Sequence, residues 1–177
     1  IPLHSALRDS LNLATVKLGM EMGLPRVMRM LQKLGVEQPL QPFPSLLLGS
    51  LQLSPLEVTQ LYQSLSAGGF KAPLRAIREV LDAHNQPLQR YPLEVEQVAE
   101  GAAVYLLNQN LREVVQSGTG RGLAAFLGDN SGIAGKTGTT NDLRDSWFAG
   151  FGEDRVATVW VGRDDNQPTG LTGSSGA

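Results

Sequence analysis

The stretch that decides the fold of this chain is Ile133-Ala134-Gly135-Lys136-Thr137-Gly138-Thr139-Thr140. Apolar residues lead into alternating threonine and glycine, which predicts a strand over residues 133–139. Two further β-rich segments, Ser146–Phe151 and Val156–Val161, follow after short turns. Because strands joined by short connections lie antiparallel, we expect the last third of the chain to form a small antiparallel meander.

The residue order of this strand suits recognition of a carboxylate. Thr137 and Thr139 alternate with Gly138, so both hydroxyls are expected on one face of the strand. Together with the ammonium of Lys136, they offer hydrogen bonds to a carboxylate. Gly138 lacks a side chain, which lets an extended substrate pair with the strand edge, and the N–H of Thr139 is suited to face a developing oxyanion. Lys-Thr-Gly is nevertheless a short string, and a strand with a glycine bulge and a solvent-facing lysine is the other interpretation.

Helices are expected before this sheet. The spacing of apolar residues predicts helices over about residues 2–9, 13–22 and 25–34. Ser54-Pro55-Leu56-Glu57 is a capping box with proline at the first helical position, so a fourth helix is expected from there to about Ala67. Helices first and a small antiparallel sheet last define an α+β fold class.

The middle of the chain combines a hairpin and a long helix. Ala76–Leu81 and Leu88–Tyr91 flank Asn85-Gln86-Pro87, which predicts a strand-turn-strand hairpin. A long helix is expected over Val95–Gln116. Its inner face is expected to consist of Val98, Ala102, Tyr105, Leu106, Leu111, Val114 and Val115. The tail Gln167–Ala177 is rich in Gly, Ser and Thr and is expected to be a loop.

A second polar pattern, Ser10-Leu11-Asn12, lies between the first two expected helices. Ser-x-Asn is common by chance, and serine and asparagine are also preferred helix caps. A capping turn is therefore the simpler interpretation of this tripeptide alone. Its combination with the Lys-Thr-Gly strand favours catalysis, because active-site serine enzymes that recognise penicillin combine Ser-x-x-Lys, Ser-x-Asn and Lys-Thr-Gly.

Composition argues against several other classes of function. Charged residues make up 18% of the chain and the net charge is -2, which leaves no basic face for nucleic acid. The chain has no cysteine, which excludes disulfides, thiolate nucleophiles and Cys-ligated zinc. Its two histidines, His4 and His84, lie far apart and are expected to be ordinary surface or hydrogen-bonded side chains. No metal or organic cofactor is expected, and no segment approaches the roughly 20 apolar residues that cross a bilayer.

The motifs and their order resemble the class A penicillin-binding proteins over essentially the whole chain. The segments that carry this resemblance are Ser10–Asn12 with Thr15-Val16, Leu53–Val58, Gly68-Gly69, Val115–Arg121, Gly135–Thr140, Asp145–Gly150 and Trp160–Arg163. Gly162–Gln167 and Gly173–Ala177 are most similar to the 1b branch of this family in Gram-negative bacteria. The resemblance implies a fold of the penicillin-binding transpeptidase and serine β-lactamase type. It also implies a bifunctional inner-membrane enzyme, in which one domain polymerises glycan strands and a periplasmic transpeptidase domain cross-links their stem peptides.

The resemblance also implies a role for each site residue. Ser10 relays protons, Asn12 orients the substrate amide, and Lys136 supplies positive potential near both Ser10 and the substrate carboxylate. The carboxylate and β-lactam-binding strand consists of Thr137, Gly138, Thr139 and Thr140. Trp147 is a candidate for the floor of the site, although an aromatic residue on a strand is more often part of the core.

One element of the family pattern is not found. The residues three positions before Lys17, Lys33, Lys71 and Lys136 are Ala14, Met30, Gly68 and Ile133, so the chain contains no Ser-x-x-Lys. We therefore expect residues 1–177 to be the C-terminal part of a transpeptidase domain, without the N-terminal part that bears the nucleophile and without the C-terminal helix. Alone, this piece is expected to be inactive. The strand Val156–Val161 is expected to have an unpaired edge.

The resemblance further implies partners and a location. Stem peptides ending in D-Ala-D-Ala and β-lactams are the expected ligands, and an outer-membrane lipoprotein activator and cell-division proteins are the expected partners. The expected location is the periplasmic side of a single-pass inner-membrane protein. Two other functions stay open at this point: a hydrolase, either a serine β-lactamase or a D,D-carboxypeptidase, and a non-catalytic module that senses β-lactams or binds peptidoglycan.

Overall fold

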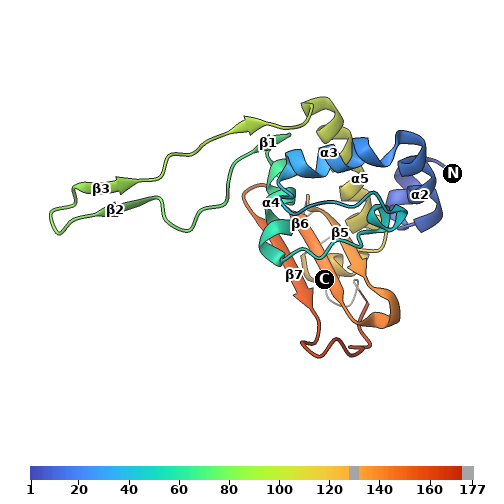
Figure 1. The fold of residues 1–177 in the computed structure, drawn as a ribbon. Coiled ribbons are helices and arrows are strands. Elements are labelled where there is room, and N and C mark those ends of the chain that lie inside the picture. Colours follow the sequence, from blue (N-terminus) through green and yellow to red (C-terminus); the bar gives the residue numbers. More distant parts are fainter. Residues whose placement is uncertain (128–131, 173–177) are drawn as a thin grey trace.

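A three-stranded antiparallel sheet forms one side of the molecule in the computed structural model, which describes residues 1–127 and 132–172 (Figure 1). Its strands are β5 (Ala134–Thr139), β6 (Ser146–Phe151) and β7 (Val156–Val161), in the order β5-β6-β7. The predicted meander is confirmed, with β5 starting one residue later than expected. Among the described residues β7 pairs only with β6, and Trp160 on it is 39% exposed, which agrees with the expected open edge.

Among the described residues every α-helix precedes the β5-β6-β7 sheet, so the α+β class is confirmed. The α-helices are α1 (Leu3–Arg8), α2 (Asn12–Met22), α3 (Leu24–Leu34), α4 (Pro55–Ser66), α5 (Gly101–Ser117) and α6 (Ala124–Leu127). Short 3-10 turns are η1 (Pro44–Leu48), η2 (Arg121–Leu123) and η3 (Asn141–Leu143). The predicted capping box is present at α4: the Ser54 hydroxyl accepts from the Glu57 N–H, and the Glu57 carboxylate accepts from the Ser54 N–H at 2.7 Å.

The helices α4 and α5 cover one face of the sheet. Their apolar side chains meet Ala134 and Phe151 in a buried cluster that also contains Leu111 of α5. Tyr62 of α4 packs edge-on against Phe151, with ring centroids 6.4 Å apart, and burial raises the pKa of Tyr62 to about 12. A second buried cluster of Val36, Leu40 and Leu46 packs against apolar side chains of α3 and α4 and holds the two helices together. The sheet that carries Lys136 is thus fixed to two helices by a continuous core.

The long helix α5 begins six residues later than predicted. Residues Glu96–Gln97 form β4, which pairs with β1 (Phe70–Lys71), and the N–H groups of Val98 and Ala99 donate to the Gly69 carbonyl. This pairing commits the backbone to an extended conformation, so the helix starts at Gly101. The predicted inner face was therefore partly wrong. Ala102, Tyr105 and Leu106 are exposed, whereas the buried stripe of α5 consists of Val104, Leu111, Val114 and Val115.

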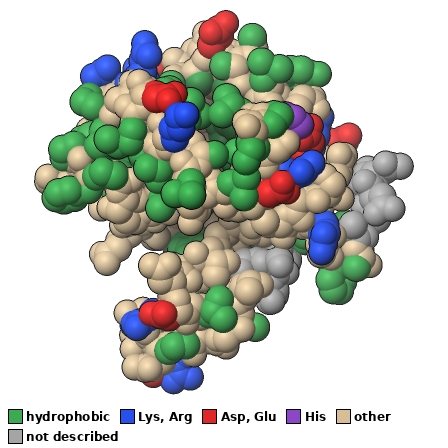
Figure 2. All heavy atoms as spheres, turned by 90° about the vertical axis from the view of Figure 1, so that its right-hand side faces the viewer, with side chains coloured by type: hydrophobic (Ala, Val, Ile, Leu, Met, Phe, Trp, Pro, Cys, Tyr) green, Lys and Arg blue, Asp and Glu red, His purple; other side chains and the backbone are tan. Residues whose placement is uncertain are grey.

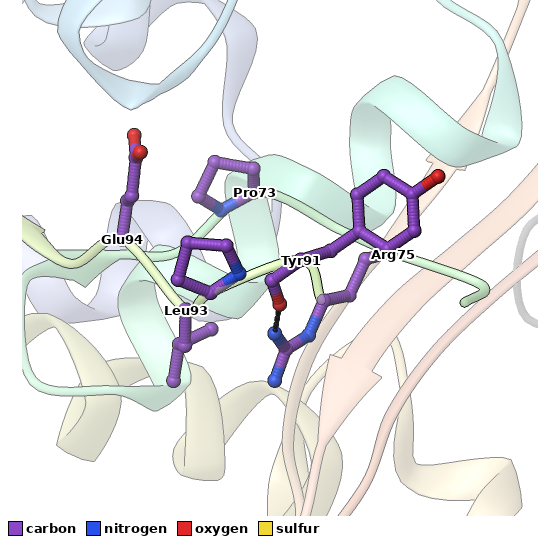
Figure 3. A pocket seen from close by; sticks show the side chains of 6 residues that line it. Pro73, Arg75, Tyr91, Leu93 and Glu94 are labelled. Atoms are coloured by element: carbon purple, nitrogen blue, oxygen red, sulfur yellow. Dashed lines mark hydrogen bonds between the residues drawn. The ribbon is translucent and has the colours of Figure 1, made fainter. Parts of the chain in front are cut away.

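The predicted hairpin is confirmed with slightly different bounds. Its strands are β2 (Glu79–Leu81) and β3 (Pro87–Arg90), and it projects away from the body of the molecule (Figure 1). Every residue of both strands is exposed. At its base a small pocket is lined by Pro73, Arg75, Tyr91, Pro92, Leu93 and Glu94, and the Arg75 guanidinium donates there to the Tyr91 carbonyl (Figure 3).

Hydrophobic side chains gather on the face that carries the N-terminal helices (Figure 2). Leu3, Leu13 and Met20 are among the exposed apolar residues of α1 and α2. In the tail, residues 167–172 form neither helix nor strand, as predicted, and residues 173–177 lie outside the described part of the chain. No helix within 1–127 or 132–172 is both long and apolar enough to span a membrane.

Candidate active site

Ser10 lies in the tight turn that joins α1 to α2. The Leu11 N–H donates to the Ala6 carbonyl at 2.9 Å, and the Ser10 N–H donates to the Leu7 carbonyl at 3.2 Å. These two bonds hold Ser10 in the left-handed region at φ 55°, a conformation that non-glycine residues adopt at a cost. The backbone of α1 therefore fixes where the Ser10 hydroxyl points.

Lys136 reaches this turn from the middle of β5. Its ammonium donates to the Ser10 hydroxyl at 2.9 Å and to the Thr137 carbonyl at 2.9 Å. The first of these bonds joins residues 126 positions apart, and it brings the Ser-x-Asn and Lys-Thr-Gly motifs together. Burial lowers the pKa of Lys136, because the partly enclosed ammonium has lost part of its hydration. The Lys136 ammonium therefore gives up its proton more readily than a surface lysine.

The Ser10-Leu11-Asn12 turn ends α1 through its backbone hydrogen bonds, as a capping turn would, but neither the Ser10 nor the Asn12 side chain caps α2. The N-cap residue of α2 is Leu11, and no side-chain hydrogen bond caps this helix. Asn12 is the first residue of α2, is exposed, and lies two positions from the serine that Lys136 contacts. The bond from Lys136 to Ser10 also excludes the alternative of a freely solvated lysine on β5.

Thr137 is held from a second direction by a residue that the sequence did not single out. The hydroxyls of Thr119 and Thr137 lie 2.6 Å apart, and the Thr119 N–H donates to the Arg8 carbonyl at 3.3 Å. Thr119 belongs to the Ser117–Gly120 turn that ends α5. The sequence signals for this residue were its place among the glycines that end the helix and its place in Val115–Arg121, one of the segments that carry the family resemblance.

The other strand residues divide between the site and the β5–β6 turn. Thr139 is exposed at the end of β5, and the strand alternation places it on the same face as Thr137. The Thr140 hydroxyl donates to the Asp145 carboxylate at 3.1 Å and accepts from the Asp145 N–H at 2.8 Å, so it closes the turn between β5 and β6.

Trp147 lies directly opposite Gly138 in the β5–β6 register. A Cβ atom at Gly138 would lie 3.1 Å from the Trp147 Cβ, so cross-strand packing is one reason for glycine at this position. Trp147 also packs against Trp160, with ring centroids 6.3 Å apart, and the Trp160 indole donates to Asp145. The aromatic pair therefore braces the strand on the face opposite to the threonine hydroxyls.

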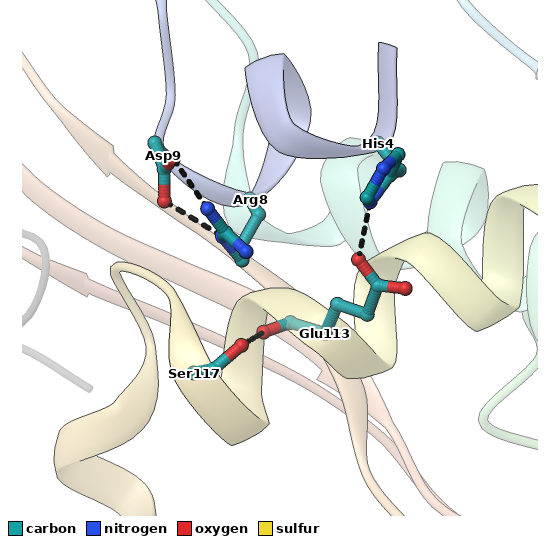
Figure 4. A network of polar contacts seen from close by, with 5 residues as sticks. All are labelled: His4, Arg8, Asp9, Glu113 and Ser117. Carbon is teal, nitrogen blue, oxygen red and sulfur yellow. Dashed lines mark hydrogen bonds and ion pairs between the residues drawn. The ribbon is translucent and has the colours of Figure 1, made fainter. Parts of the chain in front are cut away.

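A polar network joins α1 to α5 beside the site (Figure 4). His4 Nδ1 lies 3.0 Å from a Glu113 carboxylate oxygen, and the Arg8 guanidinium donates twice to Asp9. The Asp9 hydrogen bond raises the pKa of Arg8, and the Arg8 hydrogen bond lowers the pKa of Asp9. His84 lies far away on the hairpin, 3.9 Å from Asp82. Among the residues that the structure describes, no three His, Asp or Glu side chains are grouped to hold a metal ion.

The arrangement combines three chemical capabilities. A hydroxyl with a fixed direction touches a lysine of lowered pKa, which suits proton transfer at the Ser10 oxygen. The outer edge of β5 has no paired strand among the described residues, which suits an extended peptide. The Lys136 ammonium and the Thr137 hydroxyl are both hydrogen-bond donors, and each suits an anionic group beside that peptide.

Comparisons with known proteins agree with this geometry. A family model described as the penicillin binding protein transpeptidase domain matches residues 1–176. Penicillin-binding protein 1B of Vibrio cholerae is 49% identical over 178 residues, which cover 100% of this chain and 23% of that protein. Penicillin-binding protein 1B of Escherichia coli is 46% identical, with 100% of this chain and 21% of that protein covered. The expected similarity to the 1b branch is confirmed, and the chain spans about a quarter of the length of these relatives.

Solved structures agree on the fold. Penicillin-binding protein 1A from Haemophilus influenzae superposes with a TM-score of 0.89 at 24% sequence identity, covering 100% of this chain and 32% of that one. The imipenem acyl-enzyme complex of penicillin-binding protein A from M. tuberculosis gives a TM-score of 0.79 at 17% identity. The superposition covers 99% of this chain and 45% of that one. At these identities the likeness establishes the fold alone.

Proposed function

Because this chain belongs to the penicillin-binding protein transpeptidase domain family, we propose that it supplies two walls of the active site of a peptidoglycan D,D-transpeptidase. One wall is the Ser10 turn and the other is the Lys136–Thr140 strand. The observation that carries the proposal is the hydrogen bond from Lys136 to Ser10, which joins the two motifs in one site. In this proposal residues 1–177 are the C-terminal part of the transpeptidase domain of a longer protein.

The acylating serine belongs to the part of that protein outside this chain, since residues 1–177 contain no Ser-x-x-Lys. Its oxygen attacks the carbonyl of the penultimate D-Ala of a stem peptide. The acyl–oxygen bond forms, the peptide bond to the terminal D-Ala breaks, and that D-Ala leaves with a proton on its nitrogen. An amine of a neighbouring stem peptide then attacks the ester, which forms the cross-link, and the serine regains its proton.

The residues of this chain act on the protons and charges of these steps. Ser10 passes a proton between the leaving or entering nitrogen and the lysine side of the site, because its hydroxyl is both a donor and an acceptor. Lys136 orients that hydroxyl and stabilises negative charge beside it. Thr137 and Thr139 bind the terminal carboxylate, and the Thr139 N–H faces the developing oxyanion. Asn12 orients the amide of the acyl donor.

β-Lactams enter the same site in this proposal. Their ring amide takes the place of the peptide bond and their carboxylate takes the place of the terminal one, so the serine ester that forms keeps the amine leaving group tethered. The family's printed name, and the acyl-enzyme structure of the M. tuberculosis relative, support this assignment.

The longer protein is proposed to be bifunctional, with a glycosyltransferase domain and a membrane anchor that holds the transpeptidase on the periplasmic face of the inner membrane. The names of the 1B relatives support this context. An outer-membrane lipoprotein activator and cell-division proteins are the proposed partners. The chemistry proposed here uses only protein side chains and the two peptides.

A fluorescent penicillin tests the proposal. The longer protein is expected to form a covalent adduct that excess unlabelled penicillin blocks, and residues 1–177 alone are expected to form none. A specific adduct on the isolated chain would place the nucleophile within it and contradict the proposal. Rapid turnover of a chromogenic cephalosporin would indicate a hydrolase instead. Absence of any adduct on the longer protein would indicate a non-catalytic module.

A further inference from the structure

We propose that Thr119 is a positioning residue, which fixes the direction in which the Thr137 hydroxyl donates to the carboxylate of a bound ligand. This inference rests on the proposed function. The contact that carries it is the 2.6 Å separation of the Thr119 and Thr137 hydroxyl oxygens.

A hydroxyl has one hydrogen to donate, and this restricts what the pair can do. In a contact between two hydroxyls, one oxygen donates and the other accepts. If Thr137 donated to Thr119, it would have no hydrogen left for a carboxylate, and its lone pairs would face the negative charge. A bound carboxylate therefore requires that Thr119 donates to Thr137 and that Thr137 donates to the ligand. By donating its own hydrogen, Thr119 leaves the hydrogen of Thr137 free for the ligand.

The turn that carries Thr119 is held rigidly enough for such a role. The Gly118 N–H donates to the Glu113 and Val114 carbonyls at the end of α5, and the Gly120 N–H donates to the Val114 carbonyl at 3.0 Å. On its other side, the turn lies directly against α1: a Cβ atom at Gly118 would lie 2.4 Å from the Arg8 carbonyl oxygen. Thr119 is therefore placed by two helices.

Consecutive residues of β5 consequently reach α1 and the turn after it by two routes. Lys136 bonds directly to Ser10, and Thr137 connects through Thr119 to the Arg8 carbonyl, two residues before Ser10. The first route serves proton transfer and the second serves carboxylate binding. A change at Thr119 is expected to weaken the second and leave the first in place.

The test compares a penicillin with its methyl ester, because the ester lacks the negative charge that Thr137 is proposed to bind. The second-order rate of acylation is measured with both compounds on the longer protein, unaltered and as Thr119→Val, Thr119→Ser and Ser117→Ala. Valine keeps the shape of threonine without the hydroxyl, and serine keeps the hydroxyl. Ser117 is in the same turn, but its hydroxyl donates to the Glu113 carbonyl, away from the site, so it is the matched control.

The ratio of the acid rate to the ester rate is expected to fall about tenfold in Thr119→Val, the effect of one hydrogen bond. It is expected to stay within about twofold of the unaltered protein in Thr119→Ser and Ser117→Ala, because neither change removes that bond. An unchanged ratio in Thr119→Val would overturn the inference, and so would an equal loss with both compounds, which indicates a merely structural role. If the unaltered protein formed no adduct with the penicillin, the proposed function itself would fail, and this inference with it.

Discussion

Ser10 lies in an exposed turn between two helices, whereas Lys136 lies in the middle of a strand that is paired along its whole length on one side. The turn holds its serine at φ 55° by two backbone hydrogen bonds. The strand holds its lysine through the β5–β6 register, with Ala149 opposite. One side of the contact therefore carries backbone strain, and the other carries the cost of a partly buried ammonium.

This difference shows how the site is kept in place. The strand is anchored to α4 and α5 by an apolar core that contains none of the candidate site residues. The turn depends on how α1 packs against α5, through the Gly118 turn and the contact of His4 with Glu113. We expect changes on the strand side to affect chemistry most, and changes on the turn side to affect stability and geometry together.

Replacing Lys136 is expected to have the largest effect. Lys136→Met keeps the length of the side chain but removes the ammonium, and acylation of the longer protein by labelled penicillin is expected to fall roughly 10²- to 10⁴-fold, the range typical of proton-transfer groups. The stability of the chain is expected to stay the same or rise, since a partly desolvated charge is removed. Lys17→Met, which removes an exposed lysine of α2, is the control. Unchanged acylation in Lys136→Met would contradict the account.

Closing the gap between α5 and α1 is expected to have the next largest effect. In Gly118→Ala the new methyl group would lie 2.4 Å from the Arg8 carbonyl oxygen, so the turn or α1 must shift. We expect a loss of about 1–3 kcal/mol in the free energy of unfolding, the usual cost of overpacking. Gly152→Ala is the matched control, because nothing lies within 4 Å of a Cβ atom there. Denaturant unfolding of the two variants measures the difference, and equal stabilities would count against this close contact.

Two substitutions at Ser10 distinguish the backbone strain of the turn from the loss of the hydroxyl. Ser10→Ala and Ser10→Gly both remove the hydroxyl that Lys136 contacts, but only glycine adopts positive φ without a steric cost. The glycine variant is expected to be more stable than the alanine variant by about 1 kcal/mol. Both are expected to lose acylation to a similar extent. An alanine variant as stable as the glycine variant would show that the turn is not strained.

The cost of burying the Lys136 ammonium is expected to depend on pH. Burial lowers its folded-state pKa, so at low pH both states bind the proton and the full cost is present. Between the folded-state pKa and the ordinary lysine pKa of 10.5, the unfolded chain holds more protons, and stability therefore rises with pH. The stability of the unaltered chain relative to Lys136→Met should thus increase as the pH approaches 10.5. The effect is expected to be small, because the ammonium keeps two hydrogen-bond acceptors, and a decrease would contradict it.

The smallest effect is expected from a change on the hairpin, which belongs neither to the Ser10 turn nor to the Lys136 strand. Leu88 on β3 is 67% exposed, so Leu88→Ala is expected to change the free energy of unfolding by less than about 0.5 kcal/mol. Thermal unfolding measures it. A large loss would show that the hairpin packs against the body of the molecule.

The sequence predicted those parts of the fold that depend on neighbouring residues. The capping box at Ser54 and the three strands of the sheet are local patterns, and the structure confirms both. The start of α5 was wrong because the β1–β4 pairing competes with the helix, and its partner strand lies more than 20 residues away in the sequence. The assignment of Tyr105 and Leu106 to the inner face was also wrong, since both are exposed and the buried stripe of α5 begins at Val104.

The site was predictable only in part for the same reason. Ser10 and Lys136 were singled out by a resemblance to known motifs. Neither composition nor periodicity predicts that their side chains lie in contact. Thr119 was missed as a site residue because its role depends on a hydroxyl of β5 and on the backbone of α1, both of which only the folded chain places beside it. The packing reason for a glycine at position 138 likewise became clear only when the register placed Trp147 opposite it.

The measurement that tests the central claim most directly is a double-mutant cycle across the Ser10–Lys136 contact. Acylation of the longer protein by labelled penicillin is measured for Ser10→Ala, Lys136→Met and the double variant. If the two residues act as one unit, the double variant is expected to react no more than about threefold more slowly than the slower single variant, because residues that act together show non-additive losses. If the two losses instead multiply in full, Ser10 and Lys136 act independently, and the account of a shared site is contradicted.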